Sequence, residues 1–68
     1  MKFYEVIDWF DEEYGKETLE CDTLEEALKY HKHTVKEFGD CSMFDAKSSI
    51  VKDSKGKVYA KWENGNDK

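Results

Sequence analysis

The stretch that decides the fold is Thr23–Gly39, TLEEALKYHKHTVKEFG, which predicts one amphipathic helix. Thr23, followed three residues later by Glu26, matches the capping box, in which the threonine side chain accepts a hydrogen bond from the Glu26 backbone. Apolar residues and one histidine then recur every three or four positions, which places them on one face. These residues are Leu24, Ala27, Leu28, His31, Val35 and Phe38. Gly39 stands where a left-handed glycine is expected to end the helix.

Two strands are predicted before this helix. Lys2–Phe10 (KFYEVIDWF) is rich in β-branched and aromatic residues, and Glu17–Cys21 alternates between apolar and polar side chains. The polar stretch Asp11–Lys16 contains Gly15 and fits a hairpin loop between the two strands. Alternate side chains of a strand point to opposite sides, and both sides of the first strand are apolar. Phe3, Ile7 and Trp9 share one side, and Tyr4, Val6 and Phe10 share the other.

Two further strands are predicted after the helix. They are Ser42–Lys52 and Lys57–Glu63, joined by Asp53–Gly56, a tetrapeptide typical of a hairpin turn. The side chains expected to share a face are Phe44, Ala46, Ser48 and Ile50 in the first strand, and Val58, Ala60 and Trp62 in the second. The sequence therefore predicts an α+β fold of order β-β-α-β-β, in which one helix packs on one face of an antiparallel sheet of about four strands. Residues 1–63 form its single domain and 64–68 a frayed tail.

The charge is distributed unevenly along the 68 residues, whose net charge is −5. Met1–Glu26 contains ten acidic residues and two lysines, a charge of −8, whereas Ala27–Lys68 contains six acidic residues and nine lysines, a charge of +3. The absence of arginine argues against base-specific DNA recognition, which favours the planar guanidinium. No signal peptide or membrane span is evident, so we expect a cytoplasmic protein in which Cys21 and Cys41 stay reduced.

The sequence offers no recognisable catalytic, metal or cofactor site. His31 and His33 lie about 200° apart around a helix and cannot easily bind one ion; His31 is expected to be half-buried and hydrogen-bonded, and His33 exposed. There is no nucleophile with a base beside it and no glycine-rich phosphate loop. We therefore expect no enzyme activity, no metal and no cofactor.

The informative feature is the end of the first strand, where aromatic and acidic residues follow one another. A single helix covers only one side of a strand that is apolar on both, so the other side is either covered by loop and tail residues or available to a partner. The residues predicted to bind a protein partner are Trp9, Phe10, Asp11, Glu12, Glu13 and Tyr14, hereafter the Trp9–Tyr14 segment. Aromatic anchors bordered by charge are typical of protein interfaces.

In element order, size and acidity the chain resembles small phage-encoded inhibitor proteins, including some anti-CRISPR proteins. This resemblance implies a stoichiometric inhibitor that occupies a nucleic-acid-binding surface of a host complex, with carboxylates in the place of phosphates. One alternative is a homodimer or accessory subunit that pairs through the open sheet face. A second is weak nucleic-acid binding through a lysine face, although solvated lysines are the commoner explanation. That face comprises Lys29, Lys32, Lys36, Lys47, Lys57 and Lys61.

Overall fold

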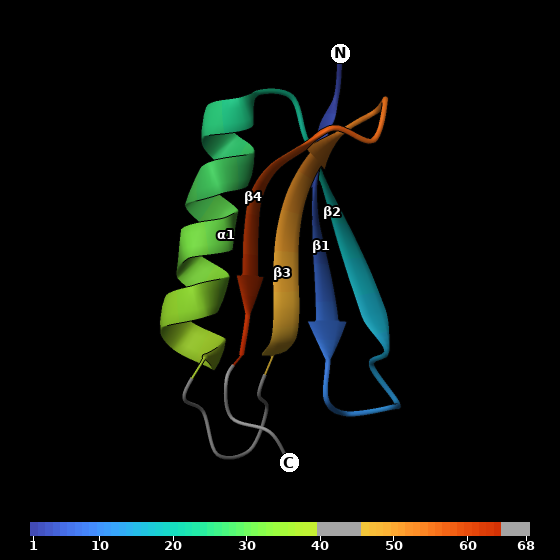
Figure 1. Cartoon of the computed structure of the whole chain (residues 1–68), viewed down its shortest axis with the longest axis vertical. Helices are drawn as coiled ribbons and strands as arrows, with labels where there is room; N and C mark the ends of the chain where they lie inside the picture. Colours follow the sequence, from blue (N-terminus) through green and yellow to red (C-terminus); the bar gives the residue numbers. More distant parts are fainter. Residues whose placement is uncertain (40–45, 65–68) are drawn as a thin grey trace.

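The computed structural model describes residues 1–39 and 46–64 and has the predicted order of elements (Figure 1). These elements are β1 (Phe3–Trp9), β2 (Lys16–Cys21), α1 (Leu24–Phe38), β3 (Ala46–Asp53) and β4 (Val58–Glu63). The strands form one antiparallel sheet of order β2-β1-β3-β4, so β1 and β3 are the central strands. The predicted α+β class is confirmed. Phe44 and the rest of 42–45, predicted to begin the third strand, lie outside the described residues.

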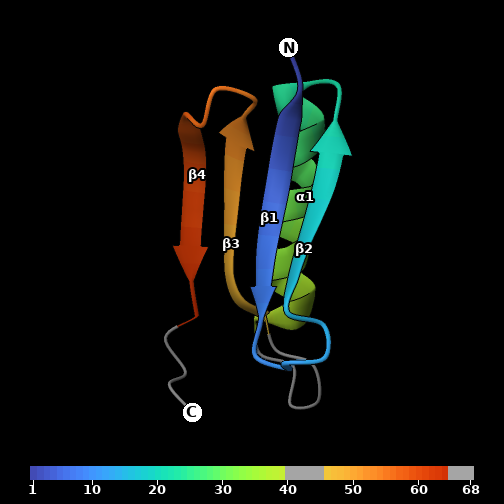
Figure 2. The same ribbon diagram turned by 90° about the vertical axis from the view of Figure 1, so that its right-hand side faces the viewer.

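The helix packs on one face of the sheet against β1, β2 and β3, and no helix or strand within residues 1–39 and 46–64 covers the opposite face, hereafter the open face (Figure 2). In β1 the side chains that alternate toward the helix include Glu5 and Ile7, both buried, whereas Tyr4 and Val6 are half-buried on the open face. The prediction that Tyr4 and Val6 point to the opposite side of β1 from Ile7 is therefore confirmed.

The start of α1 is as predicted, but its buried face is rotated from the expected one. Thr23 has extended backbone angles, and its hydroxyl accepts the Glu26 N–H at 3.2 Å. Ala27 and Thr34 are the buried residues of the helix, whereas Leu28, expected on the buried face, is 37% exposed. Small side chains at the centre of the contact allow the helix to approach the sheet closely, and this leaves Leu28 at the margin.

The end of α1 also differs from the prediction. Gly39 has φ −74° and ψ −30°, which is right-handed, and its N–H donates to the Val35 carbonyl at 3.1 Å. A Cβ at this position would collide with that carbonyl oxygen and lie 3.3 Å from the Trp62 ring. Glycine is therefore required here by the close approach of the Val35 carbonyl, with the Trp62 ring as a second tight contact, and not by a left-handed backbone.

Two register shifts explain why the predicted faces of β3 and β4 are only partly correct: Ser48 and Ile50 share a face without Ala46, and Ala60 and Trp62 share one without Val58. The first lies between Asp8 and Trp9 in the β1–β3 pairing, and the second lies between Val51 and Lys52 in the β3–β4 pairing. A bulge changes which side chains alternate to a given face. The buried residues of β3 are Ala46, Ser49, Val51 and Asp53, and Ser48 and Ile50 are only half-buried. In β4 Val58 is 50% exposed. The Tyr59 ring packs instead against the Phe3 ring, with their centroids 5.7 Å apart.

The turn between β3 and β4 is built around the Asp53 carboxylate. It accepts the backbone N–H groups of Lys55 at 2.8 Å and Lys57 at 3.0 Å, and the hydroxyl of Tyr59 at 3.0 Å. Gly56 has φ 89°, as a turn glycine requires. Burial alone would raise the pKa of Asp53, but the hydrogen bonds from Lys57, Tyr59 and Lys55 outweigh it and lower that pKa.

Asn64, predicted to belong to the frayed tail, is held in place. Its side-chain amide donates to the Gly39 carbonyl at 3.0 Å and to the Ala46 carbonyl at 3.1 Å, and its backbone N–H donates to the Lys47 carbonyl at 2.9 Å. Asn64 therefore connects the end of α1 to the start of β3. Residues 65–68 lie outside the described part of the chain.

The apolar core lies near the start of α1. Its buried members are Cys21, Ala27 and Val51, and Phe3, Leu24 and Ala60 pack against them. Cys21 is a free thiol, and burial, followed by the nearby carboxylates of Glu26 and Glu5, raises its pKa. Cys21 therefore serves as a small apolar side chain; Cys41 lies outside the described residues.

Candidate functional site

The loop between β1 and β2 is held by short-range hydrogen bonds. The Trp9 N–H donates to the Gly15 carbonyl at 2.8 Å, and the N–H groups of Tyr14 and Gly15 both donate to the Asp11 carbonyl. The Asp11 carboxylate accepts the Glu13 N–H at 2.9 Å. Gly15 has φ 55°, a left-handed conformation that closes the loop at the start of β2. The Trp9–Tyr14 segment is therefore folded into a defined turn and not extended as a flexible arm.

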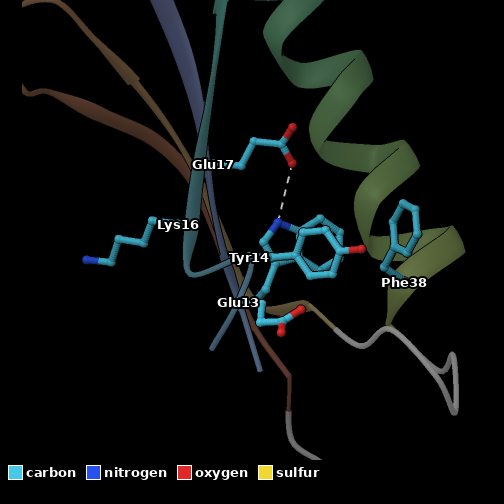
Figure 3. A pocket seen from close by; sticks show the side chains of 6 residues that line it. Glu13, Tyr14, Lys16, Glu17 and Phe38 are labelled. Carbon is cyan, nitrogen blue, oxygen red and sulfur yellow. Dashed lines mark hydrogen bonds between the residues drawn. The ribbon is translucent and has the colours of Figure 1, made fainter. Parts of the chain in front are cut away.

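This turn and the end of α1 together form a hollow, which we call the Trp9 hollow (Figure 3). Its volume is about 500 Å³, and its lining residues are Trp9, Glu13, Tyr14, Lys16, Glu17 and Phe38. The Trp9 and Phe38 rings meet edge to face with centroids 5.0 Å apart, and the Tyr14 ring lies 6.5 Å from Trp9 at a tilt of 56°. Three aromatic rings from β1, the loop and α1 thus converge at one end of the sheet.

The charged groups at the hollow have a defined orientation. The indole Nε1–H of Trp9 donates to the Glu17 carboxylate at 3.3 Å, which holds that carboxylate beside the rings. Figure 3 shows Glu13 at the margin of the hollow, and shows Lys16 extending to the far side of β2, away from the rings. Negative charge therefore faces the hollow, while the one lysine among its lining residues directs its ammonium group elsewhere.

The structure brings together part of the predicted binding segment. Trp9, Glu13 and Tyr14 line the hollow, whereas Asp11 and Glu12 are exposed beside it and Phe10 is half-buried after β1. Sequence reasoning missed Lys16, Glu17 and Phe38 as members of the site. Glu17 pairs with Ile7, so it projects toward the same face as Trp9, two residues further along β1. The hairpin register would have revealed this, and the position of Phe38 at the last turn of the helical stripe is a weaker signal.

A second feature, unforeseen from the sequence, is a buried polar chain across the centre of the fold. Glu5 and Ser49 are both fully buried, on neighbouring strands. The Ser49 hydroxyl donates to Glu5 Oε2 at 2.7 Å, and Nδ1 of His31 on α1 lies 2.8 Å from the Ser49 oxygen. A hydroxyl has one proton, and that of Ser49 is donated to the Glu5 carboxylate. The Ser49 oxygen therefore accepts from His31, whose Nδ1 carries the proton. Among the described residues, none forms a hydrogen bond with Oε1 of Glu5.

Two of the three members of this polar chain, Glu5 and Ser49, are closed to solvent. The Ser49 hydroxyl is wholly buried, so it cannot meet a substrate from solution. Burial lowers the pKa of His31, and the nearby charge of Glu5 opposes that effect only in part. The prediction of a half-buried, hydrogen-bonded His31 and an exposed His33 is confirmed. In the part of the chain that the structure describes, no three metal-ligating side chains come together.

The remaining candidate surfaces are the open sheet face and the lysines. On the open face Tyr4, Val6 and Ile50 come together from adjacent central strands and are half-buried. Lys61 pairs with Ile50 and shares that open face, whereas the helical lysines belong to the layer that covers the other face. The six lysines therefore do not form a single surface, contrary to the lysine face considered from the sequence.

No helix within residues 1–39 and 46–64 is long and apolar enough to cross a membrane. Comparisons with known proteins add no assignment: no protein-family model, curated protein or solved structure matches this chain.

Proposed function

We propose that this chain is a non-enzymatic protein-binding module that recognises a basic protein surface through the Trp9 hollow and the acidic turn beside it. The observation that carries the proposal is the convergence of Trp9, Tyr14 and Phe38 next to carboxylates that face the same hollow. Rigid aromatic anchors surrounded by charge are the composition of interface hot spots. A side chain of a partner can be buried there without unfolding any part of the fold.

The proposed partner is a nucleic-acid-binding complex, and the proposed effect is stoichiometric inhibition. The Met1–Glu26 segment, which contains the hollow apart from Phe38, has a charge of −8. A field of this sign steers the protein toward basic grooves and away from nucleic acid. The resemblance in architecture and acidity to small phage-encoded inhibitors supports the same proposal. Nucleic acid and this protein would then compete for one basic groove.

The test is a quantitative pull-down from a bacterial lysate with three baits. The first is the wild-type protein, and the second is the loop variant, D11N/E12Q/E13Q, which keeps the side-chain shapes and removes three charges. The third is the control variant, E20Q/E25Q/E63Q, which removes the same charge from exposed positions outside the hollow. A basic protein retained by the wild type and the control, lost with the loop variant, and displaced by added DNA or RNA supports the proposal. Equal retention by all three baits contradicts it.

A second candidate, homodimerisation through the open sheet face, is favoured by the half-buried cluster of Tyr4, Val6 and Ile50. A two-fold contact there would bury apolar side chains and leave the Trp9 hollow outside. Sedimentation equilibrium from micromolar to millimolar concentration tests it. A dimer that is lost in Val6→Lys, a change on the open face of a central strand, supports this candidate; a wild-type monomer throughout contradicts it.

A further inference from the structure

The chemistry of the Trp9 hollow specifies which kind of side chain it receives. Three of its six lining residues are aromatic, and its volume of about 500 Å³ lies within the range of pockets that hold small ligands. Tyr14 is 58% exposed, so one wall is open to an approaching partner. A long side chain with an apolar stem would therefore contact the rings along its length.

The electrostatics of the hollow favour a cation at the end of that stem. The Trp9 indole uses one of the several lone-pair positions of the Glu17 carboxylate, which leaves this carboxylate able to accept from a ligand as well. The hydrogen bond to a negative group also polarises the indole and makes its face more attractive to a cation. Glu13 adds a second negative charge, and Lys16 extends away (Figure 3).

Among cationic side chains, the guanidinium is the better match. It is planar, weakly hydrated and able to stack on an aromatic face, and its N–H groups can reach two carboxylates at once. An ammonium group is a compact, strongly hydrated charge that loses more hydration in an aromatic hollow. Resting on the proposed function, we infer that the Trp9 hollow receives an arginine side chain of the protein partner. Glu17 and Glu13 bind its guanidinium, and Trp9 stacks with it or with its stem.

The experiment uses N-acetyl-arginine amide as the probe and N-acetyl-citrulline amide as a neutral side chain of nearly the same shape. Two-dimensional ¹H–¹⁵N NMR of the full chain resolves the indole N–H of Trp9 and that of Trp62, which serves as an internal control. Titrations are made at constant ionic strength. Glu17→Gln keeps an acceptor for the Trp9 indole but removes the charge, and Glu20→Gln is the matched control. Glu20 is exposed on the same strand and pairs with Tyr4 of the open face.

The arginine probe should move the Trp9 indole peak in a saturable manner and leave the Trp62 peak in place. Binding of the citrulline probe, and binding of arginine to Glu17→Gln, should each be weaker by about three- to fivefold, while Glu20→Gln behaves as the wild type. N-acetyl-lysine amide should bind less tightly than arginine.

Three results would overturn the inference: equal affinity for arginine and citrulline, tighter binding of lysine, or equal shifts of both indole peaks. Each of them leaves the proposed function standing if the loop variant still loses its partner in the pull-down. Loss of the pull-down difference, with arginine still bound at Trp9, would instead contradict the proposed function and keep the hollow as an arginine site.

Discussion

Ser49 and Glu5 lie side by side on the two central strands, with the serine hydroxyl 2.7 Å from a carboxylate oxygen and both side chains fully buried. His31 extends this chain from the sheet to the helix. The middle of the fold is therefore specified by polar contacts, with the apolar core toward the start of α1 and the aromatic rings at its end. Buried polar groups are costly unless paired, so this relationship is open to direct tests of stability.

Ser49→Ala removes the only hydrogen bond to the Glu5 side chain among the described residues, and also the partner of His31. Because a buried carboxylate then has no donor, the free energy of unfolding should fall by about 2 to 3 kcal/mol, measured by urea denaturation. Ser48→Ala, a half-buried control on the other face of β3, should cost under about 0.5 kcal/mol. Similar effects of the two substitutions would contradict the importance of the polar chain.

Acidification through the ordinary histidine pKa of 6.5 should destabilise the protein. The folded structure lowers the pKa of His31, mainly by burial, so the unfolded chain binds the proton more readily and gains in relative stability as the pH falls. The urea midpoint should therefore be lower at pH 5.5 than at pH 7.5. His31→Asn, which can keep a donor toward Ser49, should flatten this dependence, whereas His33→Gln should not. An equal dependence in both variants would assign the effect to other groups.

Asp53 should act in the opposite direction, at lower pH. Burial raises its pKa, but hydrogen bonds from Lys57, Tyr59 and Lys55 outweigh this and lower it, so the contribution of Asp53 is complete above the ordinary value of 3.8. It is lost as the pH falls through the folded pKa. The wild type should unfold at higher urea concentration than Asp53→Asn at pH 6, and the difference should shrink toward pH 3. A difference independent of pH would show that shape and not charge is responsible.

Because the buried face of α1 is rotated, a substitution at Ala27 should cost more stability than the truncation of its neighbour Leu28. Leu28→Ala is expected to cost about 1 kcal/mol, below the roughly 2 to 5 kcal/mol typical of a fully buried leucine, because Leu28 is 37% exposed. Ala27→Leu is expected to cost about 1 to 3 kcal/mol, because Ala27 is fully buried between helix and sheet. If urea titrations gave Leu28→Ala the larger loss of unfolding free energy, Leu28 would belong to the buried face, as expected from the sequence.

The local features of this fold could be predicted from the sequence because each depends on a few adjacent residues. The Thr23 cap, the Gly56 turn and the order of the elements are of this kind. Features that depend on the register between strands far apart in the sequence could not be predicted. The bulge near Trp9 decides that Ser49 and not Ile50 faces the helix, and nothing in the alternation of that strand signals it.

The candidate site likewise has some residues that could be predicted from the sequence and others that only the fold brings to it. Trp9, Glu13 and Tyr14 were predicted from an adjacent run of aromatic and acidic residues, and they do line one hollow. Glu17 and Phe38 belong to it only through the hairpin register and the packing of α1. The burial of Glu5 could not be predicted, because a glutamate within a strand is ordinarily exposed and only its partner on β3 explains the burial.

The most direct test of the proposed function is the association rate of the captured partner with the loop variant, D11N/E12Q/E13Q, measured by surface plasmon resonance at low salt. Charges that border an interface mainly set the rate of encounter, whereas aromatic anchors mainly set the rate of dissociation. We expect slower association for the loop variant, with a weaker dependence on salt, and a clearly smaller change for the control variant, E20Q/E25Q/E63Q. Unchanged association of a loop variant whose fold is intact by circular dichroism would contradict the acidic surface as the binding site.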